Sequence, residues 1–180
     1  MKNRLPIVGI MGSGDTEWAE RTTELGRWLA KNGVHLLTGG GQGVMASIGR
    51  AFFEVPDRKG SVIGILPCRN DDPLCRPKEG YPNPWVEIPI LTHLPLTGDQ
   101  GAEPLSRNHI NILSSDVVVV FPGGAGALSE VVLAEKYQRP LVAYLHDRSE
   151  LPGLPPTVPI VTTLKGVQEF VNKHLHSEPS

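Results

Sequence analysis

The sequence predicts an α/β fold: a doubly wound, Rossmann-like and mostly parallel sheet with helices on both faces. Short runs of Val, Ile and Leu recur along the chain, helical patterns alternate with them, and several of the runs end in glycine. The runs are apolar at consecutive positions, which is typical of strands buried on both faces in a parallel sheet. The expected strands cover residues 5–12, 34–41, 61–67, 116–124, 140–145 and, shorter, 158–161.

Helical patterns fill the intervals between these runs. We expect Asp15 or Thr16 to cap the first helix and Gly33 to end it. Pro104 is expected to begin the third helix, because proline is tolerated in the first helical turn. Right-handed crossovers then bring the carboxyl ends of all strands to one edge of the sheet, where ligands bind in such folds. The helical patterns cover residues 18–33, 44–54, 104–115, 127–139 and 164–176.

Length and charge narrow the possible functions. The 180 residues suit one domain, spanning 1–180, and the net charge of −2 gives no support to nucleic-acid or acidic-membrane binding. No apolar run approaches the ~20 residues of a membrane span, and the N-terminus lacks a signal-peptide pattern, so we expect a cytoplasmic protein. The two cysteines, Cys68 and Cys75, form no CxxC motif, and we expect no metal site.

The stretch from Cys68 to Ala102 is rich in proline and reads as a long loop, with residues 85–91 either a strand or a covering segment. A loop of this length is uncommon in a compact domain unless it has a function. We therefore expect it to line or cover a binding site.

Three of the expected strands end in glycine-rich turns, at 9–16, 38–45 and 121–130. Glycine lets backbone N–H groups approach a ligand, and a helix that starts there directs unpaired N–H groups and its dipole at an anion. The turns lack both Gly-x-Gly-x-x-Gly and the Walker A pattern, which argues against an ordinary dehydrogenase or ATPase. They therefore predict a site for a phosphorylated small molecule that includes Gly12 and Ser13.

Two charged residues flank the fourth strand. Arg107 precedes it, next to Asn108, and Glu130 follows it one helical turn after Gly126. Glu130 is either a favourable charge near a helix N-terminus, worth ~0.3–1 kcal/mol, or a catalytic carboxylate beside a phosphate ester. Arg107 is either a surface ion-pair partner or a planar fork for phosphate. We expect the two side chains to converge on one pocket.

The motifs TGGGQGVM, SRN and PGGAGALSE, in this order, resemble the Lonely Guy (LOG) family, whose members were often mislabelled lysine decarboxylases. A pyridoxal-phosphate decarboxylase is disfavoured, because no lysine adjoins the glycine turns. The resemblance implies that Arg107 and Glu130 are the catalytic pair. It places Gly40, Gly41 and Gly43 along the same crevice. The implied phosphate-binding turn comprises Pro122, Gly123, Gly124, Ala125, Gly126 and Ala127, with Asn108 beside it.

The resemblance leaves two functions open, of which the first is our leading expectation because Pro122-Gly123-Gly124 is intact, and the second is the alternative. One is a nucleoside 5′-monophosphate phosphoribohydrolase, which releases base and ribose 5-phosphate and needs no cofactor. Asn108 stands where that branch has lysine and Ala127 where it has threonine. The segment SRNHINILSSDVVVV is closer to the molybdenum cofactor carrier branch, which binds a phosphorylated pterin without turnover. Both branches imply a homodimer or a tetramer.

Overall fold

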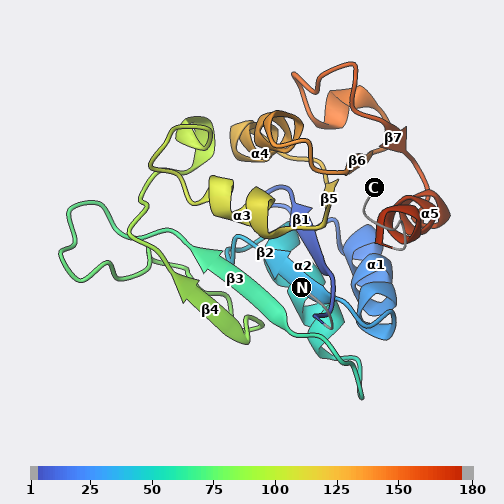
Figure 1. Cartoon of the computed structure of the whole chain (residues 1–180), viewed down its shortest axis with the longest axis horizontal. Coiled ribbons are helices and arrows are strands. Elements are labelled where there is room, and N and C mark those ends of the chain that lie inside the picture. The colour runs from blue at the N-terminus through green and yellow to red at the C-terminus, as the bar shows by residue number, and fades with distance from the viewer. Residues whose placement is uncertain (1–3, 176–180) are drawn as a thin grey trace.

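The computed structural model describes residues 4–175. Within these residues, seven strands form one sheet in the order β4-β3-β2-β1-β5-β6-β7, and each neighbouring pair is parallel (Figure 1). The expected doubly wound fold is therefore confirmed. The strands are β1 (Ile7–Met11), β2 (His35–Thr38), β3 (Val62–Leu66), β4 (Ile88–Leu91), β5 (Val117–Val120), β6 (Leu141–Tyr144) and β7 (Ile160–Val161).

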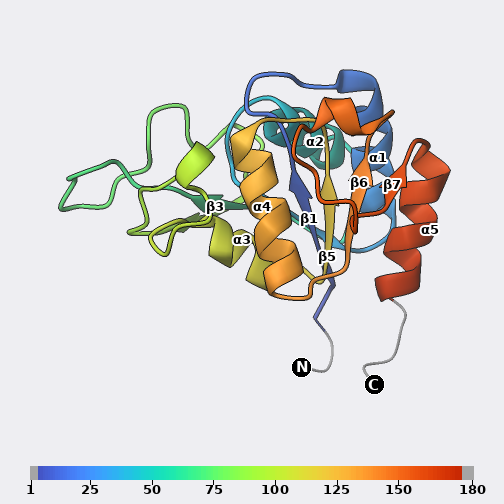
Figure 2. The same cartoon turned by 90° about the horizontal axis from the view of Figure 1, so that it is seen from above.

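Helices cover both faces of the sheet and create two apolar cores (Figures 1 and 2). One core lies under α1 (Ala19–Lys31), α2 (Val44–Phe53) and α5 (Leu164–Leu175). The other lies under α3 (Asn108–Ser114) and α4 (Ala125–Lys136). Two short 3₁₀ helices, η1 (Gly98–Gln100) and η2 (Arg148–Glu150), lie in connections. Of the helices in residues 4–175, none is long and apolar enough to cross a membrane.

The start of α1 differs from the expectation. The helix begins at Ala19, after Trp18 in a left-handed conformation, and has no side-chain cap. The backbone N–H groups of Asp15 and Thr16 instead donate to Ser13 Oγ, at 3.1 and 3.0 Å. The predicted cap at Asp15 or Thr16 is therefore wrong, because the serine organises a turn ahead of the helix. The predicted end holds: Gly33 follows the helix with φ +66°.

The predicted helix start at Pro104 is also wrong. The Leu96 N–H donates to the carbonyl of Leu105 at 3.2 Å, and Ser106 bridges to Leu96. Pro104 and Leu105 lie in a turn that the hydrogen bond from the Ser106 N–H to the Glu103 carbonyl closes at 2.9 Å, so α3 begins only at Asn108. As a result, Arg107 is the N-cap of α3 and lies at the carboxyl edge of the sheet.

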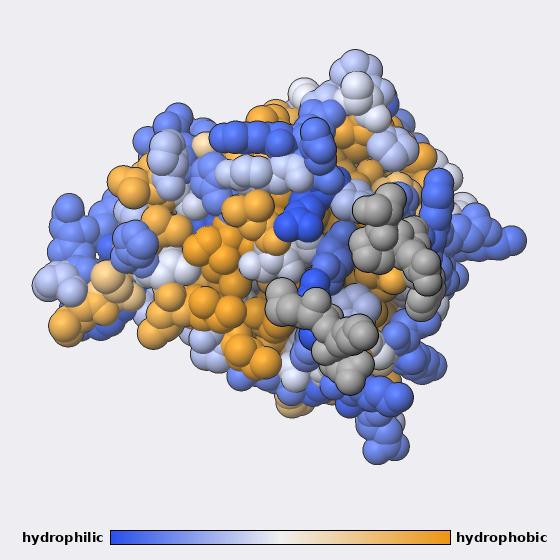
Figure 3. All heavy atoms as spheres, in the orientation of Figure 1, coloured by the Kyte–Doolittle hydropathy of each residue, from blue (hydrophilic) through white to orange (hydrophobic). Residues whose placement is uncertain are grey.

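The connection between β3 and β4, residues 67–87, contains no helix. Its last part runs along α2, where the rings of Trp85 and Phe53 lie 5.8 Å apart. All four residues of β4 are nevertheless exposed, with Ile88 and Ile90 at 42% and 41% and Leu91 at 63%. The face in Figure 3 accordingly shows apolar side chains gathered over α3 and strands β3 and β4. Residues 85–91, which the sequence left ambiguous, contain the edge strand β4.

Candidate functional site

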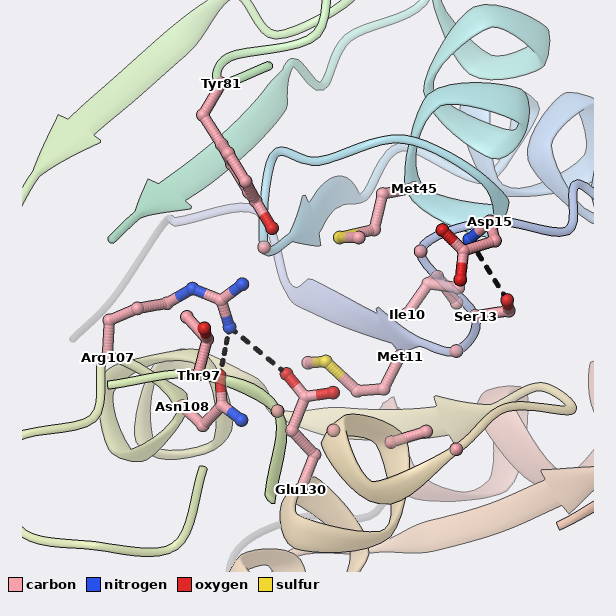
Figure 4. A pocket seen from close by; sticks show the side chains of 17 residues that line it. Ile10, Met11, Ser13, Asp15, Met45, Tyr81, Thr97, Arg107, Asn108 and Glu130 are labelled. Carbon is pink, nitrogen blue, oxygen red and sulfur yellow. Dashed lines mark hydrogen bonds and ion pairs between the residues drawn. The ribbon is translucent and has the colours of Figure 1, made fainter. Parts of the chain in front are cut away.

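A cavity of about 280 Å³ lies at the carboxyl edge of the sheet, where the turns after β1, β2 and β5 meet (Figure 4). Its volume is close to the lower end of the range for small-molecule sites. Helices α3 and α4 and the long segment before α3 complete its wall. The lining residues are Ile10, Met11, Gly12, Ser13, Gly14, Asp15, Gly39, Met45, Tyr81, Thr97, Gly98, Arg107, Asn108, Gly124, Gly126, Ala127 and Glu130.

The N-terminus of α4 presents free backbone donors to this cavity. Within the described residues, the N–H groups of Gly124, Ala125, Gly126 and Ala127 have no hydrogen-bond acceptor. The first N–H with a partner in the helix is that of Leu128, which donates to Gly124 at 3.1 Å. A Cβ built on Gly124 would meet no atom within 4 Å, so the space in front of these donors is open. Unpaired N–H groups and the helix dipole make this an anion-binding end.

Arg107 brings a cation into the same cavity. Its side chain is buried, with the residue only 5% exposed, and Nη1 lies 3.5 Å from Glu130 Oε1. Nη1 also donates to Asn108 Oδ1. Nε and Nη2 have no acceptor in the part of the chain that the structure describes. The structure therefore confirms that the side chains of Arg107 and Glu130 lie in one pocket. The unpaired Nε and Nη2 groups of the guanidinium are free to donate hydrogen bonds to a ligand.

Glu130 is held one turn inside α4. The residue is 7% exposed, and Oε1 accepts from Asn111 Nδ2 at 2.9 Å. Burial raises the pKa of the Glu130 carboxyl, and the opposing effects of the Arg107 charge and the Asn111 hydrogen bond only partly offset this rise. Oε2 has no partner among the described residues. The side chain therefore offers one free oxygen in the cavity, with a proton affinity above that of an ordinary glutamate.

The predicted site residues divide into two groups. Arg107, Glu130 and six of the predicted binding residues line the cavity, namely Gly12, Ser13, Asn108, Gly124, Gly126 and Ala127. The other six adjoin the wall without lining the cavity: Gly40, Gly41, Gly43, Pro122, Gly123 and Ala125. The Gly123 N–H already donates to the Glu150 carbonyl at 3.2 Å, and the Pro122 carbonyl accepts from the Ser13 N–H at 3.0 Å. The ligand contacts of all these residues stay predictions.

Other lining residues were not singled out from the sequence. A Cβ on Gly39 would lie 2.3 Å from Arg107 Nη2, so this glycine makes room for the guanidinium. Tyr81, Thr97 and Gly98 come from the long segment that was expected to line or cover a site, and that expectation is confirmed. The length and proline content of that segment were the signal, but nothing in them pointed to Tyr81.

Residues 4–175 contain no group of three or more His, Cys, Asp or Glu side chains that could hold a metal ion. Cys68 and Cys75 are both free thiols, and neither is among the residues that line the cavity at the carboxyl edge of the sheet.

Comparisons with known proteins agree with this architecture. The sequence model of the SLOG cluster4 family matches residues 5–168. The molybdenum cofactor binding protein of the phototrophic bacterium Rippkaea orientalis is 31% identical over 96% of this chain and 98% of its own, with a TM-score of 0.74. The molybdenum cofactor carrier protein of Chlamydomonas reinhardtii is 31% identical over 97% and 100%, with a TM-score of 0.69. An uncharacterized protein of Archaeoglobus fulgidus is 31% identical over 135 residues, 74% of this chain and 76% of its own.

Proposed function

The chain belongs to the SLOG cluster4 family, and from this membership and its pocket we propose that it binds the molybdenum cofactor, a phosphorylated pterin, as a carrier. The observation that carries the proposal is the set of four unpaired N–H groups at the start of α4, where Gly124, Gly126 and Ala127 line the same cavity as the buried Arg107. The two molybdenum cofactor proteins named above, each 31% identical over nearly the whole chain, support this choice of cargo.

The residues present fit such a cargo. The start of α4 would hold the phosphate, through backbone donors that need no side chain. Asp15 and Glu130 offer carboxyl oxygens, and Arg107 and Asn108 offer donors, for the polar edge of a pterin. Neither Cys68 nor Cys75 lines the cavity, so neither thiol would ligate the molybdenum of a cargo bound there.

Calorimetry under anaerobic conditions tests the proposal, with isolated molybdenum cofactor as the titrant. We expect binding to the wild type and an affinity at least ~10-fold lower in Arg107→Gln, because a hydrogen bond to a charged group is worth about 1.5–3 kcal/mol. Arg27→Gln is the matched control, since Arg27 is exposed on α1 and away from the cavity. Absence of cofactor binding by the wild type would overturn the proposal.

A second candidate function is the nucleoside 5′-monophosphate phosphoribohydrolase, and Glu130 is the observation that favours it. The carboxyl group lies four residues, or about 6 Å of helix rise, beyond Gly126, which leaves room for a ribose between phosphate and base. There it could stabilise an oxocarbenium-like sugar or activate water. A panel of nucleoside monophosphates, with free base measured by chromatography, separates the two functions. Release of base from any of them, lost in Glu130→Gln, would establish the hydrolase.

We also propose that the chain forms a homodimer through the exposed edge strand β4. Ile88 and Ile90 are exposed at 42% and 41%, whereas Ile63 and Ile65, which lie in register with them on β3, are buried in the core. Exposed apolar surface of this kind is typical of homodimer interfaces. Light scattering should give a dimer mass for the wild type and a monomer mass for the Ile88→Glu/Ile90→Glu variant. Leu74→Glu, at an exposed apolar residue of the β3–β4 connection, is the control that should remain dimeric.

A further inference from the structure

The β3–β4 connection reaches the cavity through one buried side chain. Asn83 is buried, and its backbone N–H donates to the Gly40 carbonyl at 2.8 Å. Its Nδ2 donates to the Gly41 carbonyl at 2.7 Å, and its Oδ1 accepts from the Trp85 N–H at 3.0 Å. A single asparagine thus ties this segment to the glycine turn after β2 and satisfies all of its own side-chain groups.

This tie places an aromatic ring at the cavity. Tyr81 lies two residues before Asn83 and lines the cavity. A Cβ on Gly41 would lie 3.0 Å from two carbons of the Tyr81 ring, so the absence of a side chain at Gly41 lets the ring pack closely on the turn. The Tyr81 hydroxyl has no partner among the described residues. Figure 4 shows the side chain entering the cavity from the side opposite Glu130, with the Arg107 guanidinium between them in this view.

Tyr81 is the one aromatic side chain among the described residues that line the cavity. The remaining wall consists of glycines, two methionines, Ile10, Ala127 and polar residues, and the phosphate donors lie at α4, on the other side of the cavity. A ligand held by its phosphate at α4 and extending across the cavity would bring its far end to Tyr81. Flat heteroaromatic rings gain affinity by stacking on aromatic side chains, largely independently of their hydrogen-bonding pattern.

We propose that Tyr81 is the stacking platform for the heteroaromatic ring of the bound ligand, and that Asn83 is the positioning residue that holds this platform. The inference rests on the proposed function only in requiring a ligand with a phosphate and a fused ring. Tyr81 then selects ring-bearing phosphate esters over simple phosphate esters. Asn83 affects the affinity for the ligand only by holding the Tyr81 ring in position.

The test compares affinities for the molybdenum cofactor and for ribose 5-phosphate, which lacks the ring. Tyr81→Leu should lower the affinity for the cofactor about tenfold or more, in line with stacking on other aromatic side chains, and leave that for ribose 5-phosphate unchanged. Tyr81→Phe, which keeps the ring, should bind the cofactor as the wild type does. Equal losses for both ligands in Tyr81→Leu, or no loss for the cofactor, would overturn the proposal.

A double-mutant cycle separates positioning by Asn83 from a general role in stability. Asn83→Ala should lower the affinity for the cofactor and leave that for ribose 5-phosphate intact. In the Tyr81→Leu background the same change should have no further effect on cofactor affinity, whereas losses that add would contradict the positioning role. If the wild type binds no cofactor, guanosine 5′-monophosphate takes its place in the same series. The Tyr81 inference is then tested even if the assignment of the cargo is wrong. Equal affinity of the wild type for guanosine 5′-monophosphate and for ribose 5-phosphate would contradict the inference.

Discussion

The turns after β2 and β5 are both rich in glycine, but they use it in different ways. In the β2 turn the protein itself fills the space: a Cβ on Gly39 would meet Arg107, and one on Gly41 would meet Tyr81 and Met45. In the β5 turn, a Cβ on Gly124 would meet nothing within 4 Å. A glycine in such a turn therefore indicates that another group approaches the backbone closely, but it does not indicate whether that group belongs to the protein or to a ligand.

The β2 turn also makes more hydrogen bonds to the rest of the protein than the start of α4 does, although the N–H groups of Gln42 and Gly43 find no acceptor among the described residues. The Gly40 N–H donates to Thr38 Oγ1 at 3.1 Å, and the carbonyls of Gly40 and Gly41 accept from Asn83. Among the described residues, the N–H groups of Gly124 and Ala125 find no acceptor. We infer that the β2 turn is a scaffold for Arg107 and Tyr81, and that the β5 turn is the anion-binding element.

The largest expected effect is on folding, at Gly43. This glycine has φ +59°, and a Cβ there would lie 2.4 Å from the backbone oxygen of Ser13. Gly43→Ala should destabilise the protein by about 3 kcal/mol or more, or roughly 6–12 °C in melting temperature. Gly124→Ala is the matched control and should change the melting temperature little. Similar losses in the two variants would break the comparison between the turns.

Gly39→Ala should affect binding more than folding. The new Cβ would displace the Arg107 guanidinium, which is the flexible end of a long side chain, so the backbone need not move. We expect the affinity for a phosphorylated ligand to fall about 10–100-fold, as when a charged hydrogen-bond donor is lost. Calorimetry and thermal melting of the same sample measure both effects. Unchanged affinity would show that Arg107 does not contact the ligand.

Ala125→Pro sharpens the assignment of the β5 turn. Ala125 is the first residue of α4, where proline is favoured, and the substitution removes one of the free N–H groups. Affinity for inorganic phosphate should fall about tenfold, and the melting temperature should stay the same or rise. A variant that binds phosphate like the wild type would place the anion elsewhere in the cavity.

The smallest expected effect concerns Glu130 and pH. Because burial raises the pKa of its carboxyl, the folded protein holds this proton more tightly than the unfolded chain does. The associated stability is fully present at low pH and is lost as pH rises through the raised pKa. The melting temperature of Glu130→Gln should therefore rise relative to that of the wild type as pH increases from about 4.5 through the raised pKa, by about 2–4 °C for each ~1 kcal/mol.

The control for this pH experiment is Glu135→Gln, at an exposed glutamate on the same helix. Its melting temperature should follow that of the wild type across the pH range. A Glu130→Gln variant that loses stability relative to the wild type as pH rises would show that the ion pair with Arg107 outweighs the cost of burial.

Much of the fold could be predicted from local patterns. Consecutive apolar residues and the helical periods between them gave the doubly wound sheet, and glycine after three strands located the site at its carboxyl edge. The sequence also predicted that Arg107 and Glu130 share one pocket, and both residues line the cavity in the structure. Two helix starts were predicted wrongly, because the turn at residues 103–106, which pairs with Leu96, and the turn at Ser13 override the local capping signals.

The sequence by itself determined the fold class, the sheet edge at which the cavity lies and the charged pair, because each follows from residues close together in the chain or from the handedness of parallel crossovers. Only the tertiary structure decided which glycine turn is filled by other parts of the protein. The β2 turn packs against Asn83 and Arg107, more than 40 positions along the chain, whereas the N–H groups of the first residues of α4 receive no acceptor from any described residue, although Gly98 lies beside Gly126. Whether a backbone donor is free for a ligand is a property of its neighbours in space, and a local pattern does not contain them.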